Sequence, residues 1–189
     1  MNKVGVMWDI ETLDLGSRSV ITQIGFIGRD LADPETTIRE VHEYLPAEPQ
    51  LALNRTMSFS TILWWMKQSD EARLKFVEST GNDFDELLAL VRSVITKFDK
   101  LVNQFDDYEV IAQGPQFDIV NLETLFSDCG QKVPWSYNKV VDLRTLARYA
   151  DVTKENFPRP ERFVAHNAIE DCRWQWMVYV EAVRKLALR

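Results

Sequence analysis

The stretch Val4-Gly-Val-Met-Trp-Asp-Ile-Glu11 is an apolar run that ends in two carboxylates, Asp9 and Glu11. Side chains of a strand alternate between its two faces, so a strand from Val4 to Ile10 aims both carboxylates at one place beyond its C-terminal end. Two like charges held this close raise each other's pKa unless a cation neutralises them. A divalent ion with oxygen ligands is the cation to expect. From this segment alone, a solvated strand end with two ordinary acids is an equally good interpretation.

Length and composition predict a single domain over residues 1–189. The chain is long enough for a two- or three-layer core, and 46% hydrophobic and 27% charged residues are ordinary for a globular protein. We see neither an apolar run of membrane-spanning length nor a secretory signal, so no membrane contact is expected. Two cysteines suit a reducing compartment, which predicts a cytoplasmic location.

The net charge of −7 argues against a protein that wraps polyanions in general. The charge is uneven, because residues 132–189 hold 11 Lys+Arg against 7 Asp+Glu. This more basic third could face phosphates while the rest of the surface stays acidic. Chance variation along a surface explains the asymmetry equally well.

Hydrophobic periodicity predicts an α/β fold with a mixed central sheet. Three β-rich runs with short connections indicate an antiparallel meander, after which strands and helices alternate, so helices should flank the sheet. Pro46 and Pro49 open a segment that we expect to be irregular, and Gly81-Asn82 should break the chain. The expected strands are 4–10, 20–27, 37–45, 109–113 and 139–142, and the expected helices are 60–67, 70–78, 83–105, 118–128, 143–150 and 168–188.

Adjacent tryptophans, Trp64 and Trp65, cannot share one helix face. One should pack inward while the other offers a ring on which a base could stack, and we take Trp65 as the candidate for substrate contact. Core packing or a loop contact for both rings is the more common arrangement.

Partners for Asp9 and Glu11 occur where later helices begin. Asp118 follows a predicted strand and a Gly-Pro turn, and Asp171 lies early in the last helix, five residues after His166. Four carboxylates can hold two divalent cations that clamp the attacking water and the leaving oxygen of a phosphodiester, and a neutral histidine can take the proton of that water. Positions i and i+5 of a helix lie about 140° apart, so His166 must precede the helix that carries Asp171. Each residue alone has an ordinary structural explanation, and the set carries the hypothesis.

Three segments together resemble the motifs of the DEDDh 3′–5′ exonucleases: Asp9-Ile-Glu11-Thr12, Gly114-Pro-Gln-Phe-Asp118 and His166-Asn-Ala-Ile-Glu-Asp171. The resemblance spans residues 4 to about 180. Trp64-Trp65 followed by Gln68-Ser-Asp-Glu-Ala72 is similar to the mycobacterial RNase-T-like exoribonucleases and the phage DexA exonucleases. Many relatives have a His-Asn pair where this chain has Gln113-Gly114-Pro115, which leaves Asp118 in place but makes a substrate contact from that turn doubtful.

The resemblance implies a ribonuclease-H-like fold and two Mg²⁺ or Mn²⁺ ions. Asp9 would bridge both ions, and Glu11 and Asp171 would complete the coordination of the first ion. Asp118 would serve the second ion, in part through water, and His166 would be the general base. Thr12 and Leu13 would meet the 3′-terminal nucleotide, with Leu13 wedged against its base. The implied activity is release of nucleoside 5′-monophosphates from single-stranded 3′ ends, with RNA slightly favoured over DNA and a homodimer as a possible assembly.

The loop over residues 152–165 carries Lys154, Arg159 and Arg162 next to the predicted site. Arg159 and Arg162 could contact substrate phosphates from a lid, and a solvated loop is the alternative. Other functions also remain open: a scavenger of very short oligonucleotides, a nucleic-acid-binding module of this fold that has lost catalysis, or a subunit of a larger assembly.

Overall fold

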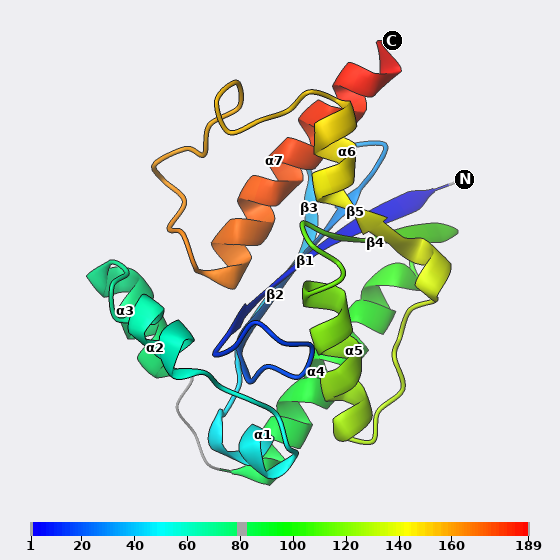
Figure 1. Ribbon diagram of the computed structural model, residues 1–189. Coiled ribbons are helices and arrows are strands. Elements are labelled where there is room, and N and C mark those ends of the chain that lie inside the picture. The colour runs from blue at the N-terminus through cyan, green and yellow to red at the C-terminus, as the bar shows by residue number, and fades with distance from the viewer. Residues whose placement is uncertain (1, 79–82, 189) are drawn as a thin grey trace.

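A five-stranded mixed sheet organises the computed structural model, which describes residues 2–78 and 83–188. The strand order is β3-β2-β1-β4-β5, with β1 in the centre (Figure 1). β1 pairs antiparallel with β2 and parallel with β4, so the meander is followed by parallel strands, as predicted. The strands are β1 (Lys3–Thr12), β2 (Ile21–Asp30), β3 (Thr37–Tyr44), β4 (Asp107–Ala112) and β5 (Val140–Asp142).

Helices cover both faces of this sheet. Figure 1 shows α6 and α7 on one side and α4 and α5 on the other. The bounds are α1 (Glu48–Ala52), α2 (Phe59–Trp65), α3 (Asp70–Glu78), α4 (Phe84–Val102), α5 (Asp118–Asp128), α6 (Leu143–Tyr149) and α7 (Ala168–Ala187), with a 3₁₀ turn η1 (Tyr137–Lys139) before β5. None of the described helices has both the length and the apolar character needed to cross a membrane.

Alternation along β1 divides its side chains between two cores. Val6 and Trp8 pack with α4 and α5, whereas Met7 packs with α6 and α7. Asp9 and Glu11 are two and four residues beyond Met7, so the same alternation sends them to the α7 face. The acids predicted to point together therefore do so at the end of the central strand.

Local signals explain most element boundaries. Asp142 caps α6 by accepting a hydrogen bond from Thr145 N (3.2 Å), and Ser69 Oγ accepts one from Ala72 N (3.3 Å) at the start of α3. The segment after Pro46 was expected to be irregular, but it forms α1, because Pro49 lies in the first turn, where a missing backbone N–H costs nothing. β2 ends at Asp30, beyond the end of the strand expected over residues 20–27. The predicted break at Gly81-Asn82 lies outside the described residues.

Candidate active site

The end of β1 supplies the first two carboxylates of the site. Asp9 accepts a hydrogen bond at Oδ1 from Gln175 Nε2 of α7 (2.7 Å). Glu11 is 9% exposed and lies at the point where the β1–β2 register shifts. Both acids line a cavity of about 740 Å³.

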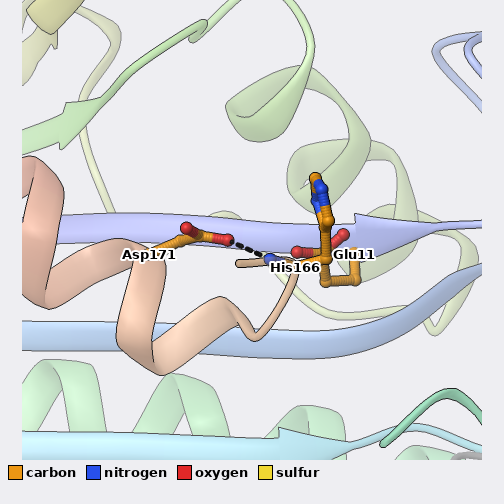
Figure 2. Close-up of side chains that lie close together, drawn as sticks. All are labelled: Glu11, His166 and Asp171. Atoms are coloured by element: carbon orange, nitrogen blue, oxygen red, sulfur yellow. Dashed lines mark hydrogen bonds between the residues drawn. The ribbon is translucent and has the colours of Figure 1, made fainter. Parts of the chain in front are cut away.

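The start of α7 supplies the next two groups. His166 has a φ of 62°, a left-handed conformation outside the helix, and its backbone N–H donates to Asp171 Oδ2 (3.1 Å). Glu11, His166 and Asp171 each offer one ligand atom, and these atoms lie within 4.8 Å of one another (Figure 2). The prediction that His166 lies in the loop and Asp171 on the helix is confirmed.

Asp118 completes the acidic cluster from the first turn of α5. Its Oδ2 accepts a hydrogen bond from Gly114 N (3.2 Å), and the residue is 8% exposed. Burial raises the pKa of Asp118 to about 7, and the charge of Asp171 acts in the same direction. All four acids line the same cavity.

The charges of this cluster act on one another. Burial, followed by the charges of Asp171 and Asp118, raises the pKa of Asp9 well above its usual range, and the same causes in the same order raise the pKa of Glu11. Buried carboxylates that repel one another need a cation to remain ionised. A set of hard oxygen donors fits a divalent ion of the magnesium or manganese type.

A protein cation already contacts the cluster. Arg159 pairs with Asp171, and its charge opposes the rise in the pKa of Glu11. The guanidinium also donates to the carbonyl oxygens of Phe163 (3.2 Å) and Val164 (2.9 Å), so it ties the loop before α7 to the site. Lys154 lines the same cavity.

His166 is held between aromatic rings. Its imidazole centroid lies 4.6 Å from that of Trp64 and 6.0 Å from that of Trp65, in both cases edge to face. Burial lowers the pKa of His166, while the charge of Asp171 opposes the change. The imidazole is therefore neutral near pH 7 and is able to accept a proton.

Arg162 is not part of this cavity. Its guanidinium lies 4.8 Å from the Phe163 ring centroid, and Nη2 lies 3.9 Å from Met177 Sδ. It lines a separate cavity beside α7. Because its side chain packs on its neighbour Phe163, the structure places Arg162 apart from the carboxylates, and its substrate contact stays a prediction.

A second cavity, of about 420 Å³, adjoins the first at Glu11 and Phe117. Thr12, Leu15 and Trp64 line it. Leu13 is only 4% exposed and packs with Val20 and Trp65, which corrects the predicted wedge, whereas Leu15 is 80% exposed.

The stacking surface predicted for Trp65 is corrected as well. Trp65 borders the second cavity but is 1% exposed, and its indole N–H donates to Thr12 O (2.9 Å). This ring holds the end of β1 in place. Of these two tryptophans, Trp64 is the exposed one, with 41% of its surface accessible.

Sequence reasoning missed three residues that line the carboxylate cavity: Gln175, Arg144 and Trp174. Gln175 follows Asp171 by one helical turn, a spacing that places it on the same face and could have identified it. Arg144 lies in the first turn of α6, two residues after the end of β5. Since β5 is parallel to β4, this position at the carboxyl end of the sheet was also a usable signal. No local pattern distinguishes Trp174 from a packing residue.

Comparisons with known proteins agree with this geometry. A family model described as the Rv2179c-like 3′-5′ exoribonuclease domain matches residues 4–183. No curated protein matches the sequence.

Solved exonuclease structures share the fold. A structure of Exonuclease I superposes with a TM-score of 0.66 at 16% identity, and E. coli Exonuclease I in complex with a dA16 oligonucleotide superposes with 0.62 at 18%. Each match covers 96% of this chain but 41% of the Exonuclease I chain, so this protein spans less than half the length of that enzyme. The nuclease domain of 3′hExo, a DEDDh family member bound to rAMP, gives a TM-score of 0.59 at 12% identity, covering 96% of this chain and 92% of that one.

Proposed function

Because this chain belongs to the Rv2179c-like 3′-5′ exoribonuclease domain family, we propose that it is a metal-dependent 3′–5′ exonuclease of the DEDDh type. It removes nucleotides from single-stranded 3′ ends and releases nucleoside 5′-monophosphates. One observation carries this proposal: four carboxylates and a neutral histidine from β1, α5 and the start of α7 line one cavity.

Asp9, Glu11, Asp118 and Asp171 would hold the divalent ions, Mg²⁺ or Mn²⁺. Such ions, when bound, polarise a phosphodiester and lower the pKa of water. The raised pKa values of Asp9, Glu11 and Asp118 support this assignment, because an uncompensated acidic cluster of this density is costly.

His166 is the proposed general base. Its ring nitrogen takes a proton from the attacking water, which requires the neutral imidazole that its lowered pKa provides. The bond from its backbone N–H to Asp171 and the edge-to-face contact with Trp64 orient the ring.

The apolar cavity beside Glu11 suits the 3′-terminal base. It is bordered by Thr12, Leu15 and the accessible ring of Trp64, and stacking on such a ring contributes roughly 1–3 kcal/mol per base. Entry of a base requires that the end be unpaired, which favours single-stranded substrates.

RNA is the favoured substrate on the description of the family. Both cysteines are free and buried, in keeping with a reducing compartment such as the cytoplasm. A homodimer stays a prediction.

The test uses labelled single-stranded RNA and DNA of the same sequence, incubated with Mg²⁺ or Mn²⁺ and with EDTA as control. We expect stepwise shortening from the 3′ end by the wild type, none in EDTA, and none with Asp9→Ala or His166→Ala. Binding without shortening would indicate a catalytically inactive module, and a mononucleotide with a 3′-phosphate would contradict the proposed chemistry.

A further inference from the structure

A third cavity, of about 520 Å³, lies where α6, α7 and the loop between them meet. Three cations border it, Arg144, Arg148 and Lys154, and no acid does. Arg144 and Arg148 are one turn apart on α6 and therefore project from the same helix face. This cavity is therefore cationic, whereas the carboxylate cavity contains four acids as well as cations.

No salt bridge holds the side chains of these cations in the part of the chain that the structure describes. Arg144, Arg148 and Lys154 are exposed, and within residues 2–78 and 83–188 their side chains make no hydrogen bond or ion pair. The charge of Arg144 does act on Asp118, where it opposes the rise in pKa, and that of Lys154 acts on Glu155. By contrast, Arg55 and Arg173 each pair with an acid. Three cations held by no salt bridge among the described residues border one cavity without an acid, so they create a local site for anions in a chain of net charge −7.

An aromatic wall accompanies the cations. Phe157 and Trp174 are stacked, with ring centroids 5.3 Å apart and planes 14° apart, and both border the cavity. Cations beside aromatic rings are the combination that single-stranded nucleic acids require, because phosphates bind the cations and bases stack on the rings.

The cationic cavity adjoins the carboxylate cavity but not the apolar cavity that contains Trp64. It adjoins the carboxylate cavity at Gln113, Arg144, Lys154 and Trp174. The apolar cavity adjoins the carboxylate cavity at a different place, Ile10, Glu11 and Phe117, and shares no bordering residue with the cationic one. The carboxylates therefore lie between an apolar and a cationic compartment.

We propose that the cationic cavity is the upstream subsite, which binds the phosphates on the 5′ side of the scissile bond through Arg144, Arg148 and Lys154. The inference rests on the proposed exonuclease function. An enzyme that cuts one nucleotide from a 3′ end needs the leaving nucleotide on one side of its metal site and the remaining strand on the other. With the terminal base in the apolar cavity, the strand continues over the cations and the Phe157–Trp174 pair.

The subsite has a consequence for substrate length. A dinucleotide has one phosphodiester, and that phosphate occupies the carboxylate cavity, so it gains little from Arg148, which borders only the cationic cavity. A longer strand places further phosphates there. The enzyme should therefore prefer strands longer than the dinucleotide.

The test compares Arg148→Ala with Arg92→Ala, an equal loss of charge on the exposed face of α4, which packs on the other side of the sheet. Steady-state kinetics are measured on a dinucleotide and on a single strand of about eight nucleotides, at several salt concentrations. For Arg148→Ala we expect the KM of the longer strand to rise about tenfold, with a smaller rise for the dinucleotide and little change in kcat. A plot of log affinity against log salt concentration has a negative slope. For Arg148→Ala the magnitude of this slope should decrease by about 0.7, the value for one phosphate contact on a single strand. Arg92→Ala should match the wild type.

Equal kinetics for Arg148→Ala and Arg92→Ala, with an active wild type, would overturn the subsite and leave the exonuclease function standing. An equal loss on both substrate lengths would also overturn it, because that pattern indicates general damage. A wild type that shortens neither strand with Mg²⁺ or Mn²⁺ would overturn the exonuclease function itself, and the subsite with it. Thermal unfolding of both variants, expected to match the wild type, verifies that they are folded.

Discussion

The backbone of Ala168 lies directly on Gly25: a Cβ added at Gly25 would come within 2.6 Å of the Ala168 carbonyl carbon. Gly25 is the residue that pairs with Asp9 in the β1–β2 ladder. The first turn of α7 therefore rests on β2 beside Asp9. Cys172 Sγ donates to Gly25 O (3.3 Å), and Ala168 N donates to Gln23 Oε1 (3.3 Å). This contact brings His166 and Asp171 to the acids of β1.

Gly25→Ala should displace the start of α7 and so separate Asp171 from Asp9. We expect a loss of about 1–3 kcal/mol in the free energy of unfolding, the range for overpacking, together with a large loss of nuclease activity. Gly16→Ala is the control, because nothing lies within 4 Å of a Cβ built at Gly16. Denaturant unfolding of both variants measures the effect, and equal stabilities would contradict the close approach.

Divalent ions should stabilise the protein against unfolding through the acidic cluster. A ligand that binds only the folded state at a hundred times its Kd adds about 2.7 kcal/mol. Without metal, Asp9→Asn should be more stable than the wild type, because it removes one of several repelling buried charges. With Mg²⁺ or Mn²⁺ that order should reverse.

Unfolding curves with EDTA and with metal measure this reversal. Glu35→Gln, a change at an exposed acid away from the cavity, should behave as the wild type in both. Equal stabilisation of Asp9→Asn and wild type by metal would remove Asp9 from the metal site.

The metal-free protein should lose stability as pH rises. Burial raises the pKa of Asp118 to about 7, against roughly 3.9 for an unfolded aspartate, so the folded state binds more protons between these values. The contribution of Asp118 to the free energy of unfolding is therefore fully present below about pH 4. It falls as the pH rises towards about 7. The lowered pKa of His166 acts in the opposite sense below about pH 6.5.

Comparing Asp118→Asn with the wild type isolates the contribution of Asp118, since His166 is common to both. The variant should show a shallower decline between pH 4 and pH 7 in EDTA, read from denaturant midpoints at each pH. Parallel profiles would show that Asp118 titrates as an ordinary surface acid.

The two adjacent tryptophans should differ in what they affect. Trp64→Ala should raise KM for single-stranded substrates, because it removes the stacking of one base, which contributes roughly 1–3 kcal/mol of binding free energy. The stability of the protein should change little. Trp65→Ala should cost about 3–5 kcal/mol of stability, because it empties a buried position and leaves Thr12 O without its donor. Kinetics and unfolding on both variants separate the roles, and a Trp65→Ala protein as stable as the wild type would contradict the packing assignment.

The sequence by itself determined the strands, the longer helices and the residues of the acidic cluster, but not α1. Period-two and helical periodicities identified the strands and the longer helices. The spacing of His166 and Asp171 required a loop before α7, and the structure has one. These features are local: alternation, helical geometry and capping depend on residues a few positions apart.

Only the tertiary structure decided which neighbouring side chains face the substrate. The register shift between Glu11 and Thr12 interrupts the alternation of β1, and beyond it Leu13 is buried while Leu15 is exposed. In the same way, packing against the end of β1 buries Trp65 and leaves Trp64 at the surface. Bulges and short helices leave the choice of buried face to whatever packs against them. The cationic cavity is the clearest case, because Arg148, Lys154 and Trp174 come from three separate segments that only the packing of α6 and the loop on α7 brings together.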